Sequence, residues 1–200
     1  MEELKKFDEI LVADERQKHF VFPDPISGYR KLELKDVYEI AANIKLHDNV
    51  PEVVRDHFST ARNLLVYSWF YYPFSVTAEF LAFVTLEFAL KERFDLKKGY
   101  GKRKEVGFKR LIEKAVKEGL VRDVGFSHIR NQSESPNGYS GYEIEFSSQQ
   151  VKCYVETLVE SLPFLRNELA HGSSILHMDG AFSVRLCAEF INQLFSEKTG

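Results

Sequence analysis

The sequence predicts an all-α fold: a bundle of about four to six helices preceded by a short irregular segment. Apolar residues recur with a 3.6-residue period from about residue 36 onward, and the segments that carry this period follow one another through short links. The 200 residues are 44% hydrophobic and 28% charged, which suits one globular domain with at most a small appendage. We therefore divide the chain into an irregular segment, residues 1–35, and a helical domain, residues 36–200.

The first half of the chain holds the irregular segment and three predicted helices. Two prolines and a glycine separate short apolar pieces in "FVFPDPISGYRKLEL", a composition typical of turns and of one short hairpin. The helical period begins at "KDVYEIAANIKLHD" and continues in helices expected over about residues 52–72 and 75–96. Pro73 separates these last two helices, because a proline interrupts the hydrogen bonding of a helix.

The second half holds three further helices and one long loop. A helix is expected over about residues 105–119, and the Ser-, Asn-, Gly- and Pro-rich segment 124–146 is expected to be a loop. The next helix begins near Ser147 or Ser148 and continues through Pro163 with a kink near Val159, and a last helix covers about residues 179–195. The buried faces predicted for these helices are Phe108, Leu111, Ile112, Ala115 and Val116; Val151, Val155, Leu158, Leu162, Leu165 and Leu169; and Val184, Cys187, Ala188, Ile191 and Leu194.

Charge and composition exclude several classes of protein. A net charge of −3 gives no overall attraction to nucleic acid or to a membrane surface. Two cysteines in apolar helices do not form a disulfide framework, and "MEELKKFDEI" lacks the apolar core of a signal peptide, so we expect a reduced, cytoplasmic protein. Residues 64–90 are apolar and long enough to span a membrane. Because Pro73, Glu79 and Glu87 interrupt them, we expect two buried helices instead.

The stretch "LPFLRNELAHGS", residues 162–173, places an arginine, an asparagine and a histidine on the last turns of a helix. At about 100° per residue, Asn167 and His171 share one face and Arg166 lies on its flank, all pointing away from the apolar stripe. An ordinary helix end explains the same residues, because Gly172 is a natural terminator and cations near a C-terminus interact favourably with the helix dipole. On the pattern alone, both interpretations stay open.

This pattern resembles the signature of the HEPN superfamily, in which an arginine is followed by a polar residue and, after four to six intervening residues, by a histidine. "RNELAH" supplies Arg166, the adjoining Asn167, and His171 after four intervening residues. The setting is similar too, with a helical hairpin near the C-terminus and a preceding apolar helix, "TAEFLAFVTLEFALKERF". The resemblance extends over about residues 52–195 and leaves the N-terminal segment without a counterpart.

The resemblance implies a small α-helical bundle of a kind found in bacterial defence and toxin systems, many of them metal-independent ribonucleases. It implies a homodimer whose two motifs face one cleft, an RNA or nucleotide ligand, and an antitoxin or other partner protein. His171 would exchange protons with the 2′-hydroxyl or the leaving oxygen, Arg166 would bind the phosphate oxygens, and Asn167 would orient His171 or hydrogen-bond the backbone. Such a cleavage needs no metal or other cofactor.

A basic run, "LKKGYGKRKEVGFKR", lies between residues 96 and 110. Tyr100 and Phe108 are interleaved with its basic residues, and this composition suits an RNA backbone and an unstacked base. A solvated loop that balances the acidic remainder explains the run equally well, and the ending of a phosphate-binding P-loop is missing. The RNA contacts predicted here are Lys97, Lys98, Lys102, Arg103, Lys104, Lys109 and Arg110.

Two acids, Glu79 and Glu87, lie in the otherwise apolar helix that precedes the basic run. A buried carboxylate requires a partner, which Arg62 or Arg166 would supply. We assign Glu87 a supporting role in the site, against the alternative that it lies on an exposed outer face.

Three functions are compatible with these observations. The first is a cytoplasmic HEPN-like dimer that binds RNA and cleaves it with Arg166 and His171. The second is a catalytically inactive HEPN-like module that binds a nucleotide, RNA or a protein. The third is a helical scaffold in which "RNELAHG" is only a helix end.

Overall fold

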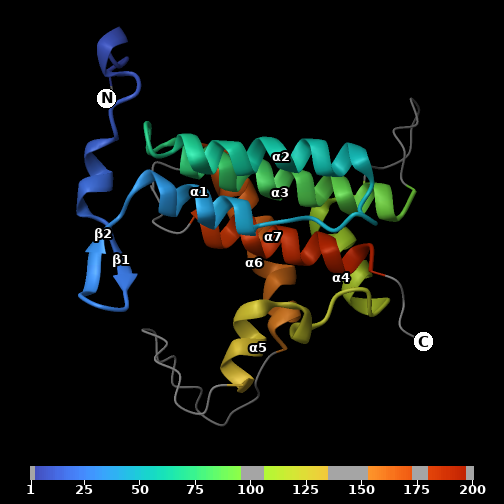
Figure 1. The fold of residues 1–200 in the computed structure, drawn as a ribbon. Helices are drawn as coiled ribbons and strands as arrows, with labels where there is room; N and C mark the ends of the chain where they lie inside the picture. The colour runs from blue at the N-terminus through green and yellow to red at the C-terminus, as the bar shows by residue number, and fades with distance from the viewer. Residues whose placement is uncertain (1–2, 96–105, 135–152, 173–179, 197–200) are drawn as a thin grey trace.

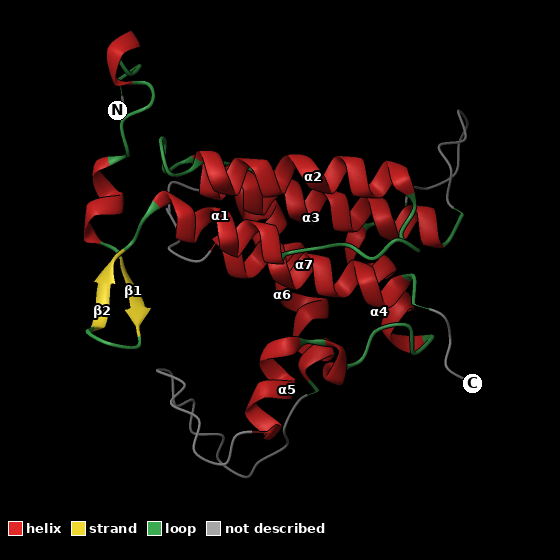
Figure 2. Ribbon diagram, viewed as in Figure 1, coloured by secondary structure: helices red, strands yellow, loops and turns green. Residues whose placement is uncertain are grey.

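The computed structural model of the chain describes residues 3–95, 106–134, 153–172 and 180–196. This part of the chain contains seven α-helices, three short 3-10 helices and one two-stranded sheet (Figures 1 and 2), so the predicted all-α class is confirmed. The number of α-helices exceeds the expected four to six because one short helix lies in the segment predicted to be a loop.

The N-terminal segment is mostly irregular and carries the predicted hairpin. It contains η1 (Phe7–Glu9), η2 (Glu15–His19), β1 (Val21–Asp24) and β2 (Gly28–Lys31), and the two strands pair antiparallel with Val21 opposite Lys31. Two buried polar side chains attach the segment to the bundle. The carboxylate of Asp14 accepts a hydrogen bond from the backbone N–H of Tyr72 at 2.9 Å, and the Gln17 amide donates to the carbonyl of Ser68 at 3.0 Å.

The bundle begins with α1 (Leu34–Asn43), α2 (Glu52–Tyr67) and α3 (Phe74–Arg93). Pro73 is the N-cap of α3, a position where its missing N–H removes no helical hydrogen bond. Helix α3 is apolar around most of its circumference and packs against α2, α4, α6 and α7. Figure 1 shows α2 and α3 side by side above α7. In the described part of the chain, no helix is long and apolar enough to cross a membrane.

The second half of the bundle consists of α4 (Phe108–Lys117), α6 (Tyr154–Ala170) and α7 (Gly180–Leu194). The predicted apolar faces are buried or packed against the core, except for Val151, which lies outside the described residues. Pro163 lies inside α6, which confirms one continuous helix, whereas the kink near Val159 stays a prediction. A Cβ atom on Gly180 would lie 2.8 Å from the Ser75 carbonyl oxygen, so glycine is what lets α7 start this close to α3.

The segment that follows α4 is partly helical, which corrects the loop predicted over residues 124–146. It contains η3 (Asp123–Gly125) and α5 (Ser127–Glu134), whereas residues 135–152 lie outside the described residues. Between these elements the side chain of Phe126 is fully buried, with ring centroids 5.3 Å from Tyr154 and 6.3 Å from Phe190. Tertiary packing therefore supports α5, in which Ser, His and Asn are weak helix formers.

Helix α6 begins at Tyr154, later than the predicted Ser147 or Ser148, which lie outside the described residues. Asp123, which is distant in sequence, caps it: its carboxylate accepts hydrogen bonds from the backbone N–H groups of Tyr154 and Val155 at 2.9 Å and from the Cys153 thiol at 3.0 Å. Burial alone would raise the pKa of Asp123, but these hydrogen bonds outweigh it and lower the pKa. Cys153 is thus an exposed capping residue, not the apolar helical residue that we expected, whereas Cys187 is buried.

The imidazole of His128 on α5 packs into an aromatic cluster, 4.6 Å from the ring of Tyr154 and 5.4 Å from the ring of Phe182 between centroids. Burial lowers the pKa of His128, against a smaller opposite effect of the Glu189 charge. The unfolded chain therefore binds this proton more tightly than the folded chain does. The stability that the folded chain gains from burying the neutral imidazole is complete above the ordinary pKa of 6.5 and is lost as the pH falls below it.

We expect the melting temperature to decrease between about pH 7 and pH 5, and the decrease to be smaller in His128→Phe, because this variant cannot bind the proton. Circular dichroism melts across this pH range measure both effects. The matched control is His19→Asn, which removes an exposed histidine and should keep the wild-type pH dependence. An unchanged pH dependence in His128→Phe would contradict the assignment.

Candidate functional site

The predicted motif lies at the C-terminal end of α6. Leu162 is buried and Leu165 and Leu169 pack against the core, so the apolar stripe faces the bundle. His171 is the C-cap, and Gly172 has a φ of 84°, the left-handed conformation that commonly ends helices. The backbone N–H of His171 still donates to the Asn167 carbonyl at 2.9 Å, so the last helical turn fixes the backbone of the histidine.

The guanidinium of Arg166 reaches from α6 to α3, where it contacts Glu87. The Nη2 atom lies 2.7 Å from one carboxylate oxygen of Glu87, and the Nζ of Lys91 lies 2.7 Å from the other. Glu87 is only 13% exposed, so one largely buried carboxylate is shared by two cations. The Arg166 side chain is 32% exposed, and its contact with Glu87 is one of the two pairings that the sequence suggested for the acids of this helix. Glu87 therefore sets the direction of Arg166.

The side chain of Asn167 also contacts Arg166. Its Oδ1 atom accepts a hydrogen bond from Nη1 of Arg166 at 3.1 Å. Asn167 therefore orients the arginine in this structure, whereas we expected it to orient His171 or to bind a backbone. A guanidinium has five N–H donors, and the hydrogen bonds to Glu87 and Asn167 use two of them. The buried Nε has no partner in the described part of the chain.

The imidazole of His171 is exposed to solvent. Among the described residues it forms no hydrogen bond with Arg166 or Asn167, because a separation of five residues places the arginine on a different side of the helix. The chain thus presents an oriented arginine and an exposed histidine as separate groups.

The second acid of α3, Glu79, faces α7 and not the motif. It is 4% exposed and accepts a hydrogen bond from the Ser183 hydroxyl at 2.6 Å. It lines a mostly apolar pocket of about 270 Å³ between α3, α6 and α7. Arg62, the other partner suggested for these acids, donates instead to the Ala41 carbonyl at the end of α1, at 3.1 Å. Of the two acids, Glu87 is therefore the one joined to the motif.

The predicted basic run is described only at its end. Lys97, Lys98, Lys102, Arg103 and Lys104 lie outside the described residues. Lys109 pairs with Glu160 of α6, with its Nζ 2.7 and 2.8 Å from the two carboxylate oxygens, and Arg110 is exposed on α4. Part of the positive charge in the described end of the run is therefore neutralised within the chain.

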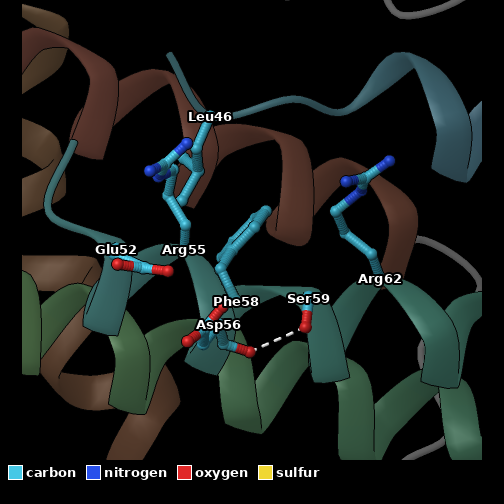
Figure 3. A pocket seen from close by; sticks show the side chains of 7 residues that line it. All are labelled: Leu46, Glu52, Arg55, Asp56, Phe58, Ser59 and Arg62. Atoms are coloured by element: carbon cyan, nitrogen blue, oxygen red, sulfur yellow. Dashed lines mark hydrogen bonds between the residues drawn. The ribbon is translucent and has the colours of Figure 1, made fainter. Parts of the chain in front are cut away.

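A pocket of about 380 Å³ lies on α2 between Arg55 and Arg62 (Figure 3). Figure 3 shows both arginines pointing to the same side of the helix, with Phe58 between them. The lining also includes the acids Glu52 and Asp56, so the charges balance. Arg62 holds the end of α1, and Arg55 lies 3.4 Å from Asp48. We interpret this pocket as part of the contact between α1 and α2, not as a ligand site.

A groove of about 660 Å³ along α7 was not predicted from the sequence. Its basic residues are Lys45, Arg130 and Arg185, which belong to three separate segments of the chain. No local sequence pattern joins them, because only the packing of the loop after α1, α5 and α7 brings them together. The basic run at residues 96–110 was the available sequence signal, and its described cations, Lys109 and Arg110, do not line this groove.

No group of three or more His, Cys, Asp or Glu side chains is placed to hold a metal ion in the described ranges of the chain. Comparisons of the chain with protein-family models, with curated proteins and with solved structures find no match.

Proposed function

We propose that this protein is a HEPN-like RNA-binding protein and a metal-independent endoribonuclease of the defence or toxin type, with a composite site at a homodimer interface. Arg166 and His171 are the catalytic residues, Asn167 and Glu87 position Arg166, and the ligand is RNA. Residues 52–195 form the HEPN-like part of the molecule.

The orientation of Arg166 is the observation that carries the proposal. Arginines at helix ends usually extend into solvent, whereas this guanidinium is fixed on two sides, by Glu87 at 2.7 Å and by Asn167 at 3.1 Å. One N–H of Nη1 and one of Nη2 remain beyond these two hydrogen bonds, whereas the Nε–H is buried. A fixed fork of donors loses little conformational entropy when it binds phosphate oxygens and stabilises the charge that develops on them.

The proposed reaction is an attack of the ribose 2′-oxygen on the adjacent phosphorus. The bond from phosphorus to the 5′-oxygen breaks, which leaves a 2′,3′-cyclic phosphate on one fragment and a 5′-hydroxyl on the other. One imidazole accepts the 2′-hydroxyl proton and a second donates a proton to the 5′-oxygen, so a dimer provides one His171 for each role. Arg166 stabilises the charge on the non-bridging oxygens.

A dimer also explains why the two residues lie apart in one protomer. His171 is exposed at the end of α6, whereas Arg166 lies on the flank next to α3. Two copies of α6 that approach each other through these ends would bring both motifs to one cleft. In this arrangement each protomer contributes to a site that is incomplete without its partner.

The catalytically inactive module is the second candidate, and the same ion pair favours it. Glu87 neutralises part of the Arg166 charge, and a guanidinium committed to a carboxylate binds phosphate less strongly. In that case the motif would bind a nucleotide, RNA or a protein without cleaving it.

Cleavage of RNA by wild-type protein and by His171→Ala, both with EDTA, tests the proposal. We expect the wild type to produce 2′,3′-cyclic phosphate ends, and His171→Ala to be slower by about 10²–10⁴-fold, because the proton transfers are lost. His19→Ala, which changes an exposed histidine of the N-terminal segment, should cleave at the wild-type rate. Absence of cleavage by a folded, dimeric wild type would contradict the nuclease and favour the catalytically inactive binding module. Equal cleavage by all three proteins would indicate a contaminating nuclease.

A further inference from the structure

The groove along α7 is built on one face of that helix. Arg185, Glu189 and Asn192 line its floor at spacings of four and three residues, which places them on the same side of the helix, and Ser196 lies just beyond the end of α7. The helical part of this floor is about 10 Å long, given a rise of 1.5 Å per residue. The segment that follows α1 supplies one wall, and η3 with the start of α5 supplies the other. Figure 1 shows the first segment running across α7 and α5 lying below it.

Polar side chains of α7 hold both walls in place. The amide of Asn192 donates to the Lys45 carbonyl at 2.9 Å and accepts from the backbone N–H of His47 at 2.8 Å. On the other side, Glu189 accepts from the backbone N–H of Ser127 at 3.3 Å, and Gln193 accepts from the backbone N–H of Arg122 at 2.9 Å. The groove is thus fixed by side-chain contacts to one helix, as expected of a preformed binding surface.

The charge of the groove is opposite to that of the whole chain. Its lining contains the three cations Lys45, Arg130 and Arg185 and a single acid, Glu189, whereas the chain carries a net charge of −3. Neither Lys45 nor Arg185 forms a side-chain hydrogen bond or an ion pair with another described residue, and both are exposed. Two cationic side chains of one groove thus have no ionic partner among the described residues, a typical arrangement for binding an anion.

We propose that this groove binds the phosphate backbone of a single RNA strand. The floor is long enough to contact consecutive nucleotides, and the described lining contains no Phe, Tyr or Trp side chain on which a base would stack. Binding is therefore electrostatic and largely independent of RNA sequence. The inference rests on the proposed RNA function for the identity of the ligand, and it adds a binding surface distinct from the Arg166 and His171 motif.

The test measures binding of the full-length protein to a 2′-fluoro-substituted single strand of about 12 nucleotides, which has the phosphates but no 2′-hydroxyl to support cleavage. Fluorescence anisotropy gives the Kd between about 50 and 200 mM salt. For the Lys45→Ala/Arg185→Ala double variant we expect a Kd at least about tenfold higher at the lower salt concentration. We also expect the slope of log K against log salt to be smaller by about 2.

Two matched double variants separate the groove from general charge effects. Lys31→Ala/Lys117→Ala removes the same two charges from exposed positions outside the groove and should keep the wild-type slope. Lys45→Arg/Arg185→Lys preserves the charge of the groove and should also keep it. An unchanged slope in the groove variant, or an equal loss in the Lys31/Lys117 variant, would overturn the inference.

Three further outcomes identify the ligand and show which of the two proposals fails. In the first, the wild type does not bind the strand but binds a free nucleoside triphosphate, and the groove variant loses that binding. This outcome would overturn the proposal of a single-strand site and define a nucleotide site instead. If the wild type does not cleave RNA but its binding to the strand depends on Lys45 and Arg185, the groove stands and the nuclease proposal fails. If the wild type cleaves RNA and the groove variant binds it normally, the nuclease proposal stands and the groove inference fails.

Discussion

Replacing Arg166 with alanine is expected to lower the rate of RNA cleavage by about 10²–10³-fold, because the transition state then loses a fixed donor to the phosphate oxygens. The loss should appear in kcat, since binding along the groove does not involve this residue. Arg166→Lys should restore little activity, because an ammonium group cannot form two directed hydrogen bonds to Glu87 and Asn167 and also reach the phosphate.

The fold should tolerate the Arg166→Ala change. Glu87 keeps its ion pair with Lys91 at 2.7 Å, so no buried carboxylate is left without a cation. Arg55→Ala is the matched control, because it removes an arginine of α2 that pairs with the fully exposed Asp48 and does not contact the motif. It should cleave at the wild-type rate. Equal activity of Arg166→Ala and Arg55→Ala would remove Arg166 from the mechanism.

Mixing wild-type and His171→Ala chains tests the composite site. Because the proposed reaction uses one His171 from each protomer, equal amounts of the two chains refolded together should have about one quarter of the activity of the same amount of wild type, since only dimers with two intact imidazoles are complete. An activity in proportion to the wild-type fraction, about one half, would contradict a site built from both protomers, provided that the two chains are shown to associate.

The Phe126→Ala substitution is expected to lower the free energy of unfolding by about 3–5 kcal/mol, because it removes a fully buried aromatic side chain and leaves a cavity. Phe126 packs against Tyr154 of α6 and Phe190 of α7 and thereby holds η3 and α5 on the bundle. The melting temperature should decrease by roughly 10 °C, as measured by calorimetry.

Val124 provides the matched control for this substitution. It lies two residues away in η3 and is 66% exposed, so Val124→Ala should change the free energy of unfolding by less than about 0.5 kcal/mol. The groove gives a second readout, because its wall includes Gly125 and Ser127 next to Phe126. A stable Phe126→Ala variant with unchanged RNA binding would show that α5 is held by other contacts.

The sequence by itself determined the helices with a clear apolar period. The faces of α4 and α7 follow the spacing of Leu111, Ile112 and Ala115 and of Val184, Cys187 and Ile191, and all of these side chains are buried. This part of the fold is predictable because a side chain's position around a helix follows directly from its position in the sequence. The end of α6 at Ala170, with His171 as the C-cap, was equally predictable from Gly172.

Tertiary structure alone decided which side chains act together. Arg166 lies 79 positions from Glu87 in sequence. The Glu87 carboxylate on α3 sets the direction of the guanidinium, and the angular positions of residues around α6 carry no information about that contact. Helix α5 directly follows the buried Phe126, whereas the Ser-, Asn-, Gly- and Pro-rich composition of residues 124–146 predicted a loop. The charged groove joins Lys45, Arg130 and Arg185 from three segments. Local periodicity determines which face of a helix is apolar, but only packing determines which polar groups of different helices meet.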